Sequence, residues 1–451
     1  MANPTNSSSS DGGCKSIQMY TTHKKHINYD NGCINLVSQS LTDEEIKSFA
    51  LFMHIPISID KQRVSKLTSL YLDDNKICCG FVNLFNVLEN LTFITEISLN
   101  NNNLGDIGAQ TFASCLHSLT NLKEIDISNN QIGLEGGKAI AKALEDNQSI
   151  HTLTMENNNL GTEGANAFGE MVSSSTIEDL VLSMNNIELF RCLDLAEGIN
   201  KSKTLLFLNM SENFATPNDE ELIILEKILM LILLSKSITN IFLQECGINN
   251  INAQYIANAL KINNSITHLF LADNSIGNVG AGLIFDALEN NINTVIKYID
   301  LSHNYDLDNS SVSKVVKLLN NNDMLQELDM SNTDINKVDG LIELGQGIKS
   351  NKSILSILLF NDEEDEEDEE DEEDAEDEED EEDEFTLLLK CNKNIFWYPY
   401  IHKFNLFNES MYKIIITVYL CNSYGNLQVR LPNNVIINLF KYFKRSSFIN
   451  T

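Results

Sequence analysis

The sequence predicts an α/β repeat solenoid, in which parallel strands line a concave side and helices cover the convex side. A frame of apolar and polar positions recurs every 27 to 30 residues, with one longer step of 33. Each copy also changes its periodicity: Leu122, Ile125 and Ile127 keep strand alternation, whereas Ile140 and Leu144 follow at helical spacing. A short strand with a return helix cannot bury its apolar face alone, so neighbouring copies must stack.

The frame L-x-x-L-x-L-x-x-N is met eleven times between residues 67 and 361, the last copy being truncated. Its polar position, called the spine position below, is expected to turn inward and to satisfy backbone groups that no strand partner reaches. Gly136 and Gly137 are expected to let the chain turn tightly into the helix. The spine position is occupied by Asn75, Asn102, Asn130, Asn158, Asn185, Asn213, Cys246, Asn274, Asn304 and Thr333.

This frame resembles the leucine-rich repeat, whose consensus allows Asn or Cys at the spine position. The repeat length and full helix resemble the ribonuclease-inhibitor-like class. Stretches such as NQIGLEGGKAIAKALEDN are similar to repeats of NOD-like receptors and of the Ran GTPase-activating protein family. The resemblance implies a leucine-rich-repeat horseshoe of about eleven repeats that binds a protein partner. Because this fold hosts many binding roles, the partner has to be argued from the residues themselves.

Composition divides the chain into five segments. Thr42 stands three residues before Glu45, which predicts a capping box at the start of a helix. The segments are a flexible N-terminal segment 1–40, a helical cap 41–66, a leucine-rich-repeat domain 67–361, an acidic low-complexity linker 362–384 and an aromatic and basic C-terminal segment 385–451.

The last two segments carry opposite charge. In the linker only Ala375 is not acidic, so like charges would repel along a helix and we predict a disordered chain. Either it is a solubilising spacer or it binds a basic protein; nucleic acid is disfavoured because acidic charge repels phosphate. In either case we predict that it contacts the basic tail transiently. Residues 430–443, RLPNNVIINLFKYF, resemble the opening of an F-box or form an ordinary amphipathic helix.

The sequence carries no recognisable catalytic, cofactor or metal motif. Zinc ligation by Cys14, His23, His26 and Cys33 matches no known spacing, and the nine scattered cysteines favour reduced thiols. No apolar run is long enough to span a membrane, and no secretory signal is recognised. We therefore expect a cytoplasmic protein, with association with the nucleus or nuclear envelope left open.

An enzymatic role is an alternative only through the Ran-type resemblance. That family carries an important arginine on a concave strand, whereas no arginine occupies the corresponding positions here and Arg191 falls beyond a strand. We therefore expect a binding scaffold rather than an enzyme. The alternatives are a Ran-type activator that binds a small GTPase and a ubiquitin-ligase adaptor that binds a ligase subunit through its F-box-like helix.

Strand alternation also predicts the surface that binds the partner. Side chains between the apolar positions should face the concave side, where an aromatic cluster with an acidic rim is typical of an interface hot spot. The alternative is that the insertion near Pro217 or the tail covers the rings. The predicted residues are Phe207, Phe242, His268, Phe270 and Tyr298, with Asp300, Glu327 and Asp329 on one side and Glu96, Glu124 and Asp126 on the other.

Overall fold

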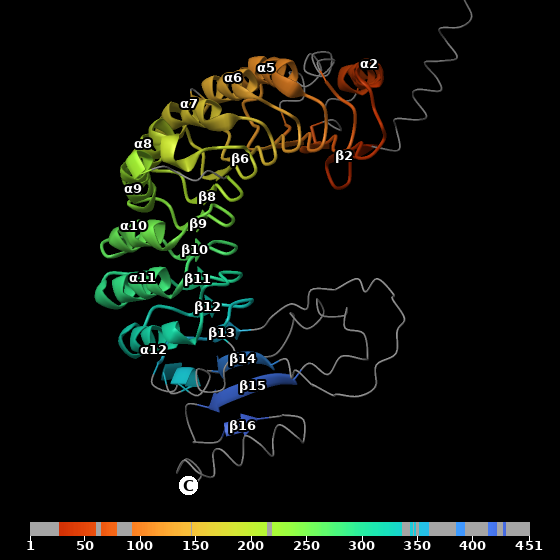
Figure 1. The fold of residues 1–451 in the computed structure, drawn as a ribbon. Helices are drawn as coiled ribbons and strands as arrows, with labels where there is room; N and C mark the ends of the chain where they lie inside the picture. Colours follow the sequence, from red (N-terminus) through yellow and green to blue (C-terminus); the bar gives the residue numbers. More distant parts are fainter. Residues whose placement is uncertain are drawn as a thin grey trace, which may run out of the picture. The chain divides into compact units, whose positions relative to one another are not determined.

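The computed structural model divides the chain into two compact units, Met1–Cys246 and Gly247–Thr451. Figure 1 labels many of the helices and strands named below. Each unit is considered by itself below. The predicted acidic linker 362–384 and the helix predicted at 430–443 lie outside the described residues. The residues described are 27–59, 65–78, 93–145, 147–213, 219–335, 343–345, 347–348, 351–359, 385–392, 414–421 and 427–429.

The first unit alternates short strands with helices. Its strands are β1 (Ile27–Asn28), β2 (Cys33–Asn35), β3 (Ser69–Tyr71), β4 (Glu96–Ser98), β5 (Glu124–Asp126), β6 (Thr152–Thr154), β7 (Asp179–Val181), β8 (Phe207–Asn209) and β9 (Asn240–Phe242). Its helices are α2 (Asp43–Ile59), α5 (Gly105–Cys115), η2 (Leu116–Ser118), α6 (Leu134–Glu145), α7 (Gly161–Ser174), η3 (Leu189–Arg191), α8 (Leu193–Lys201) and α9 (Asp219–Leu233). Strands β2 to β9 pair in parallel, and β1 pairs antiparallel to β2.

The second unit continues the same alternation. It contains α10 (Asn250–Leu260), β10 (His268–Phe270), α11 (Asn278–Asn290), β11 (Tyr298–Asp300), η4 (Asn309–Ser311), α12 (Val312–Asn321), β12 (Glu327–Asp329) and β13 (Ser356–Leu359). Strands β10 to β13 are parallel. The predicted C-terminal segment adds β14 (Phe385–Asn392), antiparallel to β13, then β15 (Ile414–Cys421) and β16 (Leu427–Val429).

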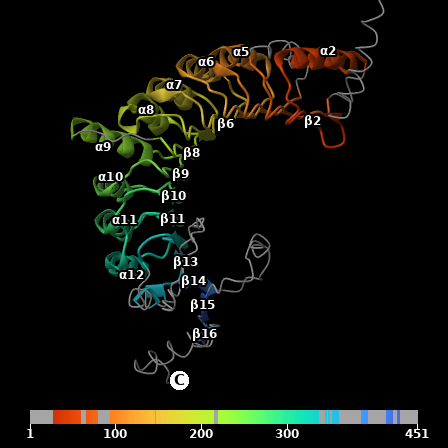
Figure 2. The ribbon, with the colours of Figure 1, turned by 45° about the vertical axis from the view of Figure 1, so that its right-hand side comes forward.

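The core of each unit lies between its strands and its helices. In the first unit the helices line one side and the strands the other, and each of α5 to α8 packs against the next helix (Figure 2). The middle residue of each three-residue strand from β2 to β12 is buried and its two neighbours are more exposed, as at Glu96, Ile97 and Ser98. Phe112 and Phe168 are fully buried from the helix side. The predicted repeat architecture of parallel strands and packed helices is confirmed.

The spine residues bond in the way that the sequence predicted. The side-chain amide of Asn158 donates to the carbonyl oxygens of Ile127 and Met155, both at 3.0 Å. Its side-chain oxygen accepts the backbone N–H groups of Asn130 at 3.1 Å and Ile132 at 2.9 Å. One buried side chain therefore joins two consecutive repeats, and similar bonds occur at Asn75, Asn102, Asn185, Asn213 and Asn304.

The turn into each spine residue uses a left-handed backbone conformation. The residue before the spine position has a positive φ, as at Asn129 (55°), Asn157 (49°) and Met184 (54°). Asn tolerates this conformation better than most residues, because its short polar side chain can hydrogen-bond locally. This explains why Asn is frequent at that position.

The tight turn expected at Gly136 and Gly137 is not the reason for these glycines. Both lie inside α6, where neither has a positive φ. A Cβ atom on Gly136 would come within 2.9 Å of the Ala109 Cβ atom on α5, and one on Gly137 within 2.6 Å of the Leu160 Cδ2 atom. The glycines therefore allow neighbouring elements to pack closely.

The N-terminal end differs from the predicted boundaries. Strand β2 lies within the segment predicted to be flexible, and it pairs with β3 in register, Ile34 with Leu70. Ile34 is fully buried, so the stack begins one strand earlier than the recognised frame. At the predicted capping box, the backbone N–H of Thr42 donates to Glu45 Oε2 at 2.7 Å. The Thr42 hydroxyl donates to the same carboxylate oxygen.

Candidate functional site

Two of the predicted aromatic residues lie on the strand face of the first unit. Phe207 is the first residue of β8 and Phe242 is the last residue of β9. Their ring centroids are 4.7 Å apart and the rings are tilted by 39°. Both side chains are half-buried, because the alternation that buries Leu208 and Ile241 turns their neighbours to the strand face.

The other predicted aromatic residues form a cluster in the second unit. His268 and Phe270 flank the buried Leu269 on β10, and Tyr298 opens β11. The centroid of the Tyr298 ring lies 4.9 Å from that of Phe270 and 6.0 Å from that of His268. We call these three residues the aromatic site.

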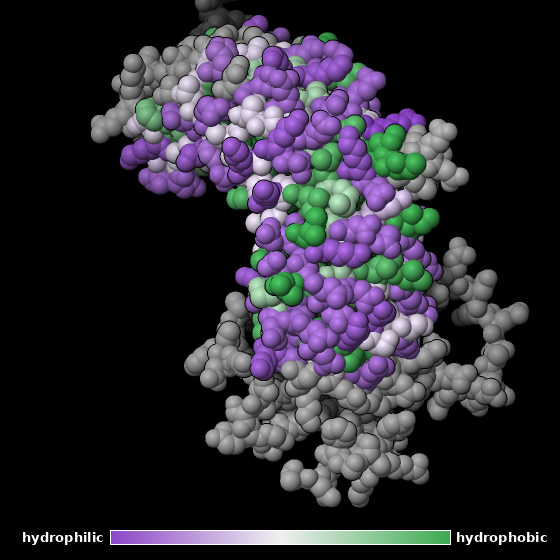
Figure 3. Space-filling model, turned by 90° about the vertical axis from the view of Figure 1, so that its left-hand side faces the viewer, coloured by the Kyte–Doolittle hydropathy of each residue, from purple (hydrophilic) through white to green (hydrophobic). Residues whose placement is uncertain are grey.

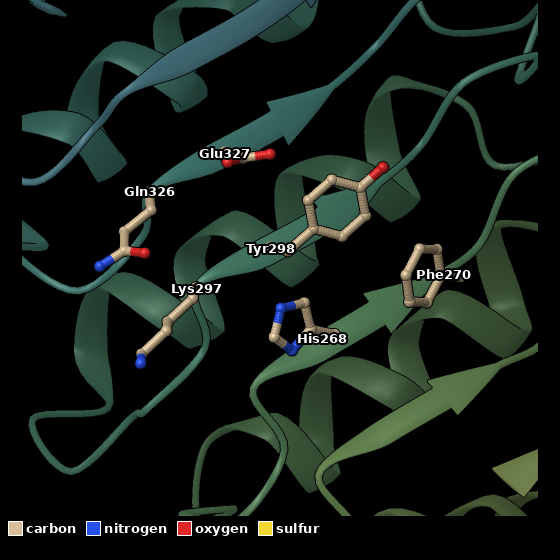
Figure 4. Close-up of a pocket in the computed structure, with 6 residues that line it drawn as sticks. All are labelled: His268, Phe270, Lys297, Tyr298, Gln326 and Glu327. Carbon is tan, nitrogen blue, oxygen red and sulfur yellow. The ribbon is translucent and has the colours of Figure 1, made fainter. Parts of the chain in front are cut away.

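The aromatic site borders an open hollow of about 230 Å³. Figure 4 shows Tyr298 between Phe270 and Glu327, with His268 and Lys297 on adjoining sides. Glu327 lies directly beside Tyr298, since the two residues are register partners on β12 and β11. The hollow thus offers flat ring surface, a carboxylate and an ammonium group to a ligand.

Carboxylates make the surroundings of Tyr298 negative. Asp300 and Asp329 are register partners on β11 and β12. The pKa of the Tyr298 hydroxyl is raised by burial first and then by the charges of Asp300, Asp329 and Glu327. The pKa of His268 is lowered by burial and by Lys297, with Glu327 opposing, which favours its neutral form.

Asp300 lies deeper than the rim position that the sequence predicted. It is only 7% exposed, and its carboxylate accepts hydrogen bonds from the Ser302 hydroxyl at 2.6 Å and the Ser302 N–H at 3.0 Å. Asp329 repeats this arrangement with Ser331, at 2.6 and 2.9 Å. Burial raises the pKa of Asp300, and the bonds from Ser302 offset part of the rise. Asp300 is therefore buried beside Tyr298 and does not belong to an exposed rim.

Two side chains at the hollow, Lys297 and Gln326, escaped the sequence prediction. Each stands directly before its strand, in the same gap between two apolar positions as a residue that was predicted, Tyr298 or Glu327. The signal was available, because the residue before a strand in this repeat also borders the strand face. The opposite predicted rim, Glu96, Glu124 and Asp126, lies on β4 and β5 of the first unit.

The helix side offers no comparable cluster in the described residues. Apolar side chains are exposed there, among them Ile251 on α10 and Val279 on α11. Figure 3 shows the exposed apolar residues of that face as separate areas among hydrophilic ones. No described helix combines the length and apolar character that a membrane crossing requires.

Arg191, the arginine considered for GTPase activation, contacts residues near it in the sequence. Arg191 ends η3, beyond the strand face, and its Nη1 atom lies 2.7 Å from Glu188 Oε2. Its guanidinium also lies 5.1 Å from the centre of the Phe190 ring. Among the described residues, no group of three or more His, Cys, Asp or Glu side chains could hold a metal ion.

A comparison with protein families agrees with the repeat architecture. A family model described as "Leucine Rich repeat" matches residues 90–113, 118–141 and 263–285. No curated protein matches the sequence. An internalin (inlF) from Listeria monocytogenes has 15% identity and a TM-score of 0.43 over 75% of this chain and 94% of its own. A chain of the yeast Rad7 and Elc1 complex has 13% identity and a TM-score of 0.41 over 76% and 80%.

Proposed function

We propose that this leucine-rich-repeat protein is a scaffold that binds another protein on its strand face, with the aromatic site of the second unit as the main contact. The observation that carries this proposal is the hollow bordered by His268, Phe270 and Tyr298. Aromatic residues of this kind supply most of the binding energy at many interfaces, because they bury a large area at little cost in conformational entropy.

The surroundings of the site support a protein partner. Its rings are half-buried and held by neighbouring strands, so they are ordered before a partner arrives. Glu327 and Lys297 stand at the edge of the hollow and can form polar contacts around an apolar centre. In the first unit, Phe207 and Phe242 offer a further apolar contact.

Fewer observations support the two alternative functions, a Ran-type activator and a ubiquitin-ligase adaptor. A Ran-type activator would need an arginine on the strand face, whereas Arg191, the only arginine among the described residues, lies in η3 beyond that face. The ubiquitin-ligase adaptor depends on residues 430–443, which lie outside the described residues. A pulldown that asks whether the tail recruits a ligase subunit would test that alternative.

Partner capture from cell extract by the intact protein tests the proposal. We expect the variant Phe270→Ala/Tyr298→Ala to lose the protein that the wild type captures, because the apolar centre of the contact is removed. The matched control is Ile251→Ala/Val279→Ala, which removes two exposed apolar side chains from the helix side of the same unit. Equal capture by the wild type and both variants would overturn the proposal.

A further inference from the structure

A second surface, in the first unit, is strongly acidic. An open hollow of about 200 Å³ lies on the strand face of β3 to β6. It is lined by four acidic residues, Asp73, Glu96, Glu124 and Asp126, and by Tyr71. None of these residues belongs to the aromatic site, and the proposed function does not explain them.

The acidic side chains are placed against one another by the strand register. Glu96 on β4 is the direct partner of Glu124 on β5. Like charges directly opposite on neighbouring strands destabilise a sheet. In the described part of the chain, the ion pairs involve none of Asp73, Glu96, Glu124 or Asp126. The repulsion is therefore not relieved by a neighbouring cation of the described chain.

Neutral donors hold three of these carboxylates in position. Glu96 Oε2 accepts from the Tyr71 hydroxyl at 2.8 Å and the Ser69 hydroxyl at 3.0 Å. The backbone N–H of Asn100 donates to Asp73 Oδ1 at 2.8 Å, and the N–H of Ser128 donates to Asp126 Oδ1 at 2.9 Å. These bonds order the carboxylates but leave their negative charge in place.

The acidic character continues along the strand face. Glu156 follows β6, and Glu178 and Asp179 stand at the start of β7. Strands β3 to β7 and the residues next to them carry eight Asp or Glu residues, but Lys123 is their one basic residue other than histidine. The residues counted are 68–74, 95–101, 123–129, 151–157 and 178–184. An isolated metal ion would need three or more ligands brought together, which is not found among the described residues. The negative charge is instead spread over five neighbouring strands, which suits a partner segment in an extended conformation.

We infer that the strand face of the first unit over β3 to β7 docks a Lys- or Arg-rich segment of another protein. Charge complementarity selects the partner: ordered carboxylates on successive strands match the guanidinium and ammonium groups of such a segment. Nucleic acid is the wrong class, because its phosphates carry the same sign of charge as the surface. This inference does not depend on the proposed function, since the two surfaces share no residue.

The test measures binding of a fluorescent peptide of alternating Arg and Ser to the intact chain. The variant Glu96→Gln/Glu124→Gln/Asp126→Asn removes three charges from the strand face and keeps acceptors for the neutral donors. The control Glu163→Gln/Glu170→Gln/Asp194→Asn removes three charges from exposed helix-side residues of the same unit. Because both variants retain the acidic linker, any binding by the linker cancels in the comparison.

We expect the strand-face variant to raise the Kd about tenfold, equivalent to about 1.4 kcal/mol, and the control to change it little. The strand-face variant should unfold at no lower temperature than the wild type, since it removes repulsion. Equal weakening in both variants, no weakening in either, or preferential binding of a single-stranded oligonucleotide would overturn the inference. Phe270→Ala/Tyr298→Ala should bind the peptide normally, which separates this outcome from that of the partner-capture experiment.

Discussion

The side-chain oxygen of Asn158 accepts the backbone N–H of Asn130 at 3.1 Å, across 28 residues of sequence. The same side chain donates to Met155 in its own repeat. A single amide therefore satisfies backbone groups in two consecutive repeats. Such groups would otherwise be buried without a partner, because the strands are only three residues long and soon leave the sheet.

Replacing Asn158 by Leu should destabilise the protein. The N–H groups of Asn130 and Ile132 would lose their acceptor, at roughly 1–3 kcal/mol for each buried group left unsatisfied. Urea unfolding of the wild type and the variant measures the change in the free energy of unfolding. Asn159→Leu is the control, because Asn159 is exposed and its side chain accepts one surface bond, from Asn186. Equal stability of the two variants would contradict the role assigned to the spine.

Replacing Met184 by Asn should stabilise the protein. Met184 has a φ of 54° at the position where several other repeats carry Asn. A left-handed conformation costs an ordinary L-residue about 1–2 kcal/mol, of which Asn recovers a part. The control is Met324→Asn, since Met324 is similarly exposed (39% against 36%) and has no positive φ. Thermal unfolding should show a gain only for Met184→Asn, and a gain of equal size in both would point to another cause.

Replacing Asp300 by Asn should stabilise the protein more at pH 7 than near pH 4. Burial raises the pKa of Asp300 in the folded chain, so the folded state holds this proton more tightly than the unfolded state does. Protonated Asp300 makes its full contribution to the free energy of unfolding below the ordinary aspartate pKa. This contribution is lost as the pH rises through the pKa of Asp300 in the folded chain. Asn stays neutral and keeps an acceptor for Ser302.

Chemical unfolding of this variant at both pH values provides the measurement. Asp323→Asn, at an exposed residue of the same unit, controls for the loss of one negative charge. If Asp300→Asn raised the free energy of unfolding as much near pH 4 as at pH 7, burial of the Asp300 charge would not be the cause of the gain in stability.

GTP hydrolysis by a panel of small GTPases should proceed at its intrinsic rate in the presence of the protein. Arg191 lies in η3, away from the strand face, with its guanidinium beside Glu188 and Phe190. We expect the wild type and Arg191→Ala to be equally without effect. Stimulation by the wild type that disappears in Arg191→Ala would support the Ran-type alternative instead.

The repeat frame was predictable because its information is local and periodic. Apolar positions fixed the strands, and the recurring Asn fixed the turns, both at constant spacing. Strand β2 was missed because Asn31 and Gln39 stand at its first apolar and spine positions, although Ile34 and Leu36 keep the alternation. An end strand packs against a repeat on one side only, so fewer of its positions need the apolar residues and the Asn of the frame.

The aromatic residues of the candidate site were predictable, whereas Lys297, Gln326 and the burial of Asp300 were not. Alternation placed Phe270 and Tyr298 on the strand face, and the structure places them there. Their 4.9 Å contact runs diagonally between strands, since the register partner of Phe270 is Asp300. The burial of Asp300 depends on such neighbours, which a single repeat does not reveal.

The contribution of the aromatic residues to partner binding tests the scaffold account most directly. The measurement is isothermal titration of the purified captured partner into the wild type, Phe242→Ala and Phe270→Ala, with Val279→Ala as the control from the helix side. We predict that each aromatic variant loses at least about 2 kcal/mol of binding free energy while its unfolding temperature stays close to that of the wild type. Full affinity in the double variant Phe242→Ala/Phe270→Ala would contradict the claim that the partner binds on the strand face.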